Sequence, residues 1–570
     1  MPTTMSVTDR RYWWLLAFAL LLLGAGIGLR DPWPTDEPRY ALVAKQMVDS
    51  GQWLFPRRGI ELYSDKPPLF MWKQATAYHL TGSWRVAFLL PALLSGLLTL
   101  VLVHDLARRL HGRRVAWVAT AALLFTIHFT FQTRAGQIDG TLIGIFTLAC
   151  YGLLRHLLLG PDRRWLLIGC FFAGIGTITK GVAFLALLLL PLAWVARRLG
   201  VNGLVPPSAP GAPRLLLPAM LAFLLAVSLW LVPMLTVVWT SGDPTYRAYA
   251  DDILFGQTAK RYLAADHHLH PPWYYLGVIA TLWLPVAFAL WWALPHWIRG
   301  WRRGHRPAAV WLPLALTAVI VLFFSLSDGK RDVYILPALP MFVLAVAPLL
   351  PVLLKRISVQ RVLFGFAMAI SLVLTAVSSW ALLGEPEFAE RMREQRGLEP
   401  WPIPLAMGLI GLTLALVLRA RRGALVLAGT LTAIWLNYGF WAYPVLNDSR
   451  SARGAMQAAG QRVGPDAELA LLGWKPQNLL MADRPTTVFG YLRPRAEQEI
   501  AAVAWLREKP DLRYVIAQTQ SLEACFHPDR AHHVGQANRR DWYVAGADAL
   551  RDECLAHPPE AWTEYKIERD

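Results

Sequence analysis

The stretch "YWWLLAFALLLLGAGIGL" (residues 12–29) decides the fold class, because it is long and apolar enough to cross a bilayer. Comparable runs recur at 86–103, 215–239 and 361–383. About 13 such segments precede residue 442, when two short or glycine-broken ones are counted. Of the 570 residues, 55% are hydrophobic and only 17% are charged. We therefore predict a mainly α protein, a polytopic transmembrane helix bundle.

The distribution of charge predicts the orientation of this bundle. A net charge of +17 would suit a nucleic-acid partner, but the basic clusters lie between apolar runs. Clusters such as "RRLHGRR" (108–114) and "RGWRRGHR" (299–306) occupy every second connection. This alternation is the positive-inside pattern, which places those connections and the N-terminus in the cytoplasm and excludes a nucleic-acid function. Residues 31–83 and 240–272 are then the two long outside loops.

The composition changes after residue 442, which divides the chain into a transmembrane domain (1–442) and a soluble tail (443–570). The tail is polar, and short strand-like runs at 467–474, 486–492 and 513–519 alternate with a helical pattern at 497–509. That order predicts a small α/β domain. An odd number of crossings from an inside N-terminus places this domain on the outer side of the membrane.

Two of the four cysteines, Cys525 and Cys554, lie in the tail. An oxidising exterior would permit a disulfide between them, and two free buried thiols are an equally weighted alternative. Cys150 and Cys170 lie in apolar runs and are expected to be ordinary core residues.

The segment "WPTDEPRYALVAKQM" (33–47) opens the first outside loop with the adjacent acidic residues Asp36 and Glu37. Carboxylates beside a bilayer are costly unless they are hydrated or functional. Apolar residues after them share one helical face, which predicts a short amphipathic helix along the membrane surface. A structural alternative makes Asp36 an N-cap with Pro38 in the first turn. That alternative leaves Glu37 and the basic residues further along unexplained.

Basic residues recur where the apolar runs meet the outer side. They are Lys66, Arg134, Lys180, Lys260, Arg261, Lys330 and Arg331. A lysine at such an edge can simply extend to the lipid headgroups. Outside loops are normally poor in Lys and Arg, however, and mid-membrane insertion of one costs about 3 kcal/mol. Taken together, these residues predict a bound anionic group at the outer leaflet, such as a lipid phosphate, facing a carboxylate.

An ordered set of motifs resembles the membrane-embedded GT-C glycosyltransferases. Among these it is similar to the protein O-mannosyltransferase-related branch, which includes an aminoarabinose-lipid A transferase. The motifs are "DEPRYALVAKQMVDSGQWLFPR" (36–57), "YSDKPPLFMW" (63–72), "TRAGQIDGTL" (133–142), "TITKG" (177–181), "FGQTAKR" (255–261) and "SDGKRDVYILPALP" (327–340). The resemblance covers residues 12–345 well and the remainder only in layout.

The resemblance implies a glycosyltransferase at the periplasmic face of the bacterial inner membrane. Its donor would be a sugar on a polyprenyl (undecaprenyl) monophosphate, and its acceptor lipid A or another envelope glycolipid. A protein hydroxyl is the alternative acceptor, and membrane lipids are the remaining partners.

The resemblance also assigns roles to individual residues. Asp36 matches the catalytic carboxylate, and Lys66 and Arg261 match the cations that hold the lipid phosphate. The further residues expected to bind substrate are Glu37, Arg39, Asp139, Lys180, Lys330 and Tyr334. Single displacement would invert the anomeric carbon. A divalent cation near Asp65 is an option in this branch, but we assign no metal ligands.

Two other classes of protein compete with this interpretation. A transporter or flippase for an anionic lipid-linked sugar would also gather cations at the outer edge, but such proteins tend to show internal repeats and helices broken at mid-membrane. We find no repeat. A structural assembly protein would leave Asp36, Glu37 and Lys66 without a purpose.

Overall fold

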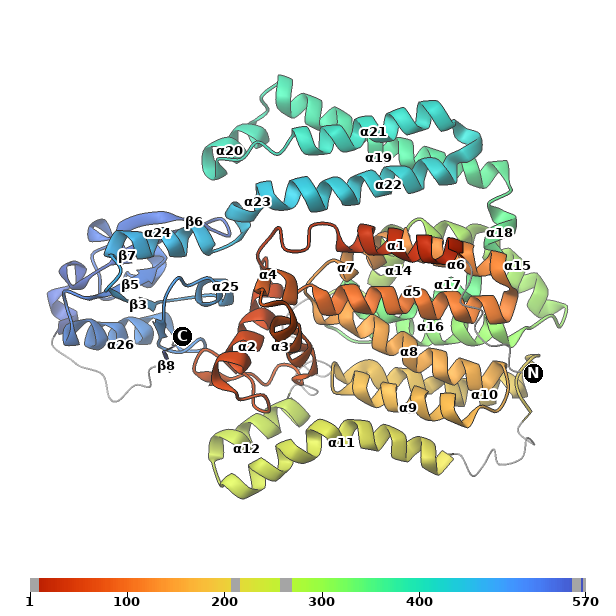
Figure 1. Cartoon of the computed structure of the whole chain (residues 1–570), viewed down its shortest axis with the longest axis horizontal. Helices are drawn as coiled ribbons and strands as arrows, with labels where there is room; N and C mark the ends of the chain where they lie inside the picture. Colours follow the sequence, from red (N-terminus) through yellow and green to blue (C-terminus); the bar gives the residue numbers. More distant parts are fainter. Residues whose placement is uncertain (1–9, 207–215, 257–268, 556–564, 567–570) are drawn as a thin grey trace.

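The computed structural model describes residues 10–206, 216–256, 269–555 and 565–566. The molecule is elongated, with the helix bundle at one end and the tail at the other (Figure 1). Within these ranges, seven helices are long and apolar enough to cross a bilayer, or nine if each of two bent helix pairs crosses once. The prediction of a multi-pass helix bundle is confirmed. These helices alone do not decide the finer prediction of about 13 crossings.

The centre of the bundle is formed by α5 (Leu90–His111), α8 (Ile138–Leu158) and α9 (Arg163–Thr177). Gly152 of α8 lies against Gly169 of α9, and a Cβ at Gly152 would come within 2.8 Å of the Gly169 backbone. Small residues allow membrane helices this close approach. The bundle also contains α1 (Arg10–Gly24), α6 (Arg113–Leu124), α7 (Ile127–Thr133), η1 (Gly181–Leu188), α10 (Leu189–Arg198), α11 (Leu216–Ser241), α14 (Tyr274–Leu282), α15 (Leu290–Arg302), α16 (Ala308–Ser325), η5 (Asp332–Ala338), α17 (Leu339–Val346), α19 (Ile357–Leu383), α21 (Pro402–Leu418) and α22 (Gly423–Asn437).

The first long loop folds into α2 (Glu37–Ser50), a short β1–β2 hairpin (Arg57–Arg58 and Glu61–Leu62), α3 (Leu69–Thr81) and α4 (Trp84–Ala87). The sequence explains both ends of α2. Pro38 sits in its first turn, where a missing N–H does no harm, and Gly51 ends it with a φ of 70° that suits glycine.

Helix α2 is covered by protein on two faces. Tyr40, Val43 and Met47 pack with side chains from α3 and the loop before it. Ala41 and Leu42 belong to a second apolar cluster that extends into the tail. The predicted helix is therefore present, and its apolar side chains are covered by protein from α3 and the tail. This burial fixes the start of α2, and with it Asp36. The position of α2 along the membrane surface stays a prediction.

The tail contains a six-stranded mixed sheet in the order β6-β7-β5-β3-β4-β8. Strand β3 runs parallel to β4 and β5, and the other pairings are antiparallel. The strands are β3 (Glu468–Leu471), β4 (Thr486–Val488), β5 (Arg513–Ala517), β6 (His532–Ala537), β7 (Arg540–Ala545) and β8 (Tyr565–Lys566). The helices are α24 (Arg453–Val463), α25 (Pro476–Leu480) and α26 (Arg495–Glu508).

Alternation along β3 builds two apolar layers in the tail. Leu469 and Leu471 point into the cluster that holds α24 and α25, whereas Ala470 and Leu472 point into the cluster that holds α26. Cys525 and Cys554 form a disulfide with a Cα–Cα distance of 5.4 Å, which is one of the two alternatives left open by the sequence. Cys150 and Cys170 are free and buried.

Candidate active site

Asp36 lies at the first turn of α2, where its carboxylate is held between two arginines. Arg39, one turn along α2, donates to Oδ1 at 2.7 Å, and Arg331, immediately before η5, donates to Oδ2 at 2.7 Å. The side chain occupies the N-cap position but makes no capping hydrogen bond to the helix. The structural N-cap alternative therefore does not account for this carboxylate.

The surroundings of Asp36 keep it ionised. Burial raises the pKa of this carboxyl, but the charges of Arg331 and Arg39 outweigh burial, and Lys180 adds a smaller effect in the same direction. The net result is a pKa below the usual value for aspartate. Asp36 is thus a carboxylate at neutral pH and a weak base.

A second buried pair lies beside this centre. Lys180, which precedes η1, donates to Asp139 of α8 at 2.5 Å, and the two side chains are 9% and 6% exposed. The Lys180 Nζ also lies 4.6 Å from the centre of the Tyr334 ring on η5. Three motifs that are distant in the sequence therefore meet at one place, as the prediction of a shared site requires.

Lys66 and Asp65 lie on the loop between β2 and α3. Lys66 is buried, and its Nζ donates to the backbone carbonyl of Asp65 at 3.1 Å. The Asp65 carboxylate approaches Arg39 at 3.6 Å and Arg58 at 4.0 Å. Arg39 therefore contacts both Asp36 and Asp65, and Asp65 is next to Lys66, so these charged groups lie close together.

Three polar atoms on α2, β1 and this loop make no hydrogen bond within the described part of the chain. The buried Arg39 Nε, Arg58 Nε and Tyr63 hydroxyl make no hydrogen bond to any residue that the structure describes. Buried donors of this kind normally have an acceptor. Their position beside Lys66 and Asp36 marks a place where an anionic ligand would complete the site.

The described residues around Asp65 do not form a good binding site for a divalent cation. No group of three or more His, Cys, Asp or Glu side chains in these parts of the chain could hold a metal ion. Two guanidinium groups also compete for the Asp65 carboxylate. Lys260 and the predicted phosphate ligand Arg261 lie outside the described residues. The cation near Asp65 stays a prediction.

Two other predicted cations hold backbone groups. Lys330 is 2% exposed and donates to the carbonyls of His270, at 2.8 Å, and Ser327. Arg134 is also buried and donates to the carbonyls of Leu22 and Ala25 at the end of α1. Both geometries indicate that these side chains shape the outer loops around the site.

Glu37 holds the loop that carries Asp36. Its carboxylate accepts two hydrogen bonds from Arg30, at 2.5 and 2.8 Å, and one each from the backbone N–H groups of Trp33 and Gly136, both at 2.8 Å. Arg30 in turn lies over the rings of Trp33 and Tyr443. This saturation favours a structural role for Glu37 over the predicted substrate contact.

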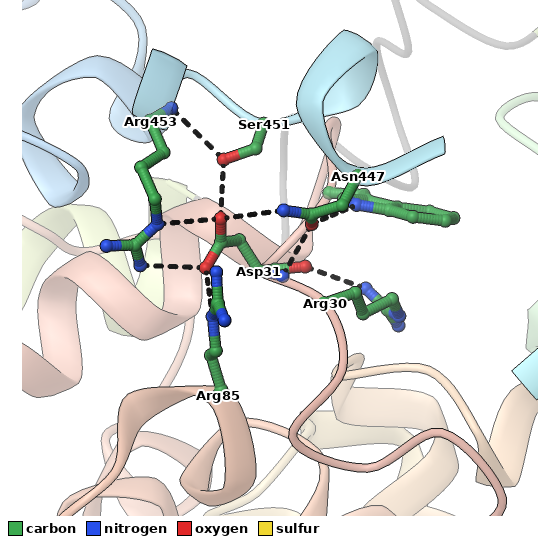
Figure 2. Close-up of polar contacts among 7 residues, drawn as sticks. Arg30, Asp31, Arg85, Asn447, Ser451 and Arg453 are labelled. Atoms are coloured by element: carbon green, nitrogen blue, oxygen red, sulfur yellow. Dashed lines mark hydrogen bonds and ion pairs between the residues drawn. The ribbon is translucent and has the colours of Figure 1, made fainter. Parts of the chain in front are cut away.

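The neighbouring Asp31 ties the same loop to the tail (Figure 2). Its fully buried carboxylate accepts five hydrogen bonds: two from Arg453, at 2.8 and 3.0 Å, and one each from Arg85, Ser451 and Asn447, at 2.8, 2.8 and 3.1 Å. We call Asp31 and these four partners the Asp31 clasp. It joins the first outside loop to α23 (Tyr443–Arg450) and to the start of α24.

Sequence reasoning missed Arg30, Asp31 and the role of Arg331. The signal for the first two was present, because adjacent charges at the end of the first apolar run invite the same argument as Asp36 and Glu37. Arg331 lies in a quoted motif, but its partner is 295 positions away and leaves no local trace.

The bundle, the outer carboxylates and the surrounding cations define a polytopic membrane protein with a one-sided polar site. Residues 65–204 match the family described as dolichyl-phosphate-mannose-protein mannosyltransferase. ArnT from Cupriavidus metallidurans bound to undecaprenyl phosphate has the same fold, with a TM-score of 0.71 and 19% identity over 94% of this chain and 98% of that one.

Curated relatives agree with this match. An undecaprenyl phosphate-alpha-4-amino-4-deoxy-L-arabinose arabinosyl transferase of Shewanella sediminis is 28% identical over 56% of each chain. A second one, from Sodalis glossinidius, is 24% identical over 93% of this chain and 88% of its own. The alignment with the Shewanella protein thus spans just over half of that relative. The resemblance to this branch of membrane glycosyltransferases is confirmed.

Proposed function

We propose that this chain is a glycosyltransferase that moves a sugar from an undecaprenyl monophosphate carrier to lipid A or a similar envelope glycolipid. The observation that carries the proposal is the set of unpartnered buried donors beside Lys66 and Asp36, within the described residues. Arg39, Arg58 and Tyr63 would donate to an anion bound there, and charge-assisted hydrogen bonds to phosphate are strong. The names of the relatives and the undecaprenyl phosphate of the ArnT structure support the same class of donor.

In this proposal the cations stabilise the departing lipid phosphate. Lys66 and the predicted Arg261 neutralise the charge that develops as the bond between sugar and phosphate breaks, in a site where a low dielectric strengthens them. Lys180, held by Asp139 and Tyr334, would face the donor from the opposite side. The acceptor oxygen attacks in a single displacement and inverts the anomeric carbon.

The role of Asp36 depends on the acceptor, and its environment favours a phosphate. A hydroxyl acceptor must lose a proton, which asks for a base with a pKa near the working pH. The pKa of Asp36 lies below its usual value, so this carboxylate is a poor base. A phosphate acceptor is already ionised and needs only orientation and charge balance. The low pKa of Asp36 therefore favours a phosphorylated glycolipid over a protein hydroxyl as acceptor.

The proposed function requires that Asp36, Lys66 and the tail lie on the periplasmic side of the membrane. Seven long apolar helices, two bent pairs, three shorter apolar helices and α9 would together supply thirteen crossings within the described residues. With a cytoplasmic N-terminus, this odd number places Asp36, Lys66 and the tail in the periplasm of a bacterial cell.

Mass spectrometry of lipid A and of envelope glycoproteins tests the function. Cells that express the chain should carry the mass addition of a sugar on lipid A phosphate, and cells with Asp36→Asn should lack it. An addition found only on proteins would replace the glycolipid acceptor, and no addition on either class would contradict the transferase.

A further inference from the structure

A cavity of about 420 Å³ lies where the last membrane helices meet the tail. Its walls come from α20 (Glu387–Arg396), the start of α21, the segment 438–450 and the turn between β6 and β7. Figure 1 shows α20 on one side of α23 and the hairpin of β6 and β7 on the other. Pro34, two positions before Asp36, also lines it. The cavity therefore borders the loop that carries the catalytic candidate.

The lining of the cavity combines three arginines with apolar side chains. Arg396, Arg450 and Arg539 are its charged residues, and no Asp or Glu lines it. None of the three guanidinium groups forms an ion pair or hydrogen bond with another residue in the described part of the chain. Planar guanidinium forks suit phosphate oxygens, so the cavity is complementary to a phosphate group.

The backbone at Arg539 supports a binding role. Asn538 and Arg539 form the two-residue turn between β6 and β7, with φ angles of 50° and 66°. Such turns favour Asn followed by Gly, because both central residues have positive φ. An arginine in the glycine position is strained, and strain of this kind concentrates at ligand sites. The turn holds Arg539 in the lining of the cavity.

The wall formed by α23 is tied to the first long loop and adjoins exposed aromatic side chains. Helix α23 is fixed by the Asp31 clasp through Asn447, while Ser449 and Arg450 of the same helix line the cavity. Just before it, Phe440 and Trp441 are 52% and 42% exposed. A ligand with a phosphate head and acyl chains would match both the cavity and this surface.

We propose that this cavity binds the phosphate-bearing headgroup of the acceptor, a phosphorylated glycolipid of the outer leaflet, and presents it to the Asp36 loop. The inference rests on the proposed function, in which the donor phosphate occupies the Lys66 side. It adds a separate acceptor subsite formed by Arg396, Arg450 and Arg539, between the bundle and the tail.

The test uses the full chain with the double substitution Arg396→Gln and Arg539→Asn, since Asn tolerates the positive φ of the turn. Arg450 stays unchanged because it lies over Trp33 in the Asp36 loop. The matched control is Arg391→Gln, on the same helix as Arg396 but paired with Glu387 outside the cavity. Binding of lipid A, of dephosphorylated lipid A and of phosphatidylglycerol is measured on the purified proteins.

The double variant should bind lipid A roughly tenfold more weakly or worse, since each charge-assisted contact contributes that much. Its KM for lipid A should rise, while its undecaprenyl phosphate affinity and the control variant stay at the wild-type level. Equal binding of lipid A to double variant and wild type would overturn the subsite. The subsite would also be overturned if the wild-type protein bound dephosphorylated lipid A or phosphatidylglycerol as tightly as it binds lipid A.

Failure of the underlying function has a different signature. A wild-type protein that transfers no sugar contradicts the transferase, whatever the binding data show. A wild-type protein that transfers sugar, with a KM for lipid A that the double variant leaves unchanged, contradicts the acceptor subsite alone.

Discussion

The Asp31→Asn substitution should loosen the tail from the membrane bundle without removing any residue that faces substrate. Asp31 is fully buried, and its charge is balanced by Arg453 and Arg85. Asparagine keeps the shape of the side chain and some hydrogen bonds. It removes the negative charge that makes the bonds from the two arginines strong.

The expected loss can be bounded from the geometry. Breaking a buried ion pair typically costs 3–5 kcal/mol, but the side chains of Arg453 and Arg85 are 39% and 41% exposed and can be rehydrated. We therefore expect the tail docking to weaken by about 2–4 kcal/mol. That change raises the undocked population by roughly 30- to 800-fold.

Hydrogen exchange of the segment 443–463 and limited proteolysis read out this docking in the purified full chain. Asp31→Asn should speed both, and the control Glu387→Gln, which removes an exposed ion pair with Arg391 on α20, should not. Glycosyl transfer should fall because the Asp36 loop loses its anchor. Exchange and cleavage at wild-type rates in Asp31→Asn would refute the clasp as a docking element.

The pH dependence supplies a second readout. Burial raises the pKa of Asp31, but the bonds from Arg453 and Arg85 outweigh it and set the pKa well below the usual value. A depressed carboxylate pKa contributes stability that is complete above the unfolded pKa, about 3.9, and is lost as the pH falls toward the folded pKa. Docking should be constant from neutral pH down to about 4 and weaken below it. In Asp31→Asn this acid-dependent step should be absent.

Four further predictions address the site and the topology. Asp36→Asn should abolish transfer while expression and detergent stability stay near normal, and half of wild-type turnover would refute a catalytic role. Lys66→Ala and Arg261→Ala should each lower affinity for undecaprenyl phosphate roughly ten- to a hundredfold, whereas Asp36→Asn should not; titration of the purified variants decides between these outcomes. Alkaline phosphatase fused after Asn447 should be active and a cytoplasmic fluorophore there silent, and the reverse pattern would move the site to the other face. Non-reducing peptide mapping should recover the two tail cysteines as one linked pair, and two alkylated thiols would exclude the bond in the cell.

The charged residues that need an explanation could be found from the sequence, but their partners could not. Asp36, Lys66 and Asp139 stand out because charge at the edge of an apolar run is costly. The same argument applies to Lys330, which nevertheless turns inward to backbone carbonyls, since a lysine has no local feature that distinguishes a ligand contact from a structural one.

The environment of α2 was also beyond sequence reasoning. An apolar stripe on a short helix is the same whether lipid or protein covers it, and here α3 and the tail do so. The pairing of Asp36 with Arg331 likewise depends on how the bundle brings two loops together.

The Asp31 clasp can form only late in the synthesis of the chain. Asp31 is synthesised 422 residues before its main partner, Arg453. At about 5–20 residues per second, the ribosome needs roughly 20–80 s to make that intervening chain. During this interval Arg85 is the only arginine of the clasp that has been synthesised, so the five hydrogen bonds to Asp31 cannot all form. The first long loop therefore gains its full attachment to the tail only after the start of α24 has been made.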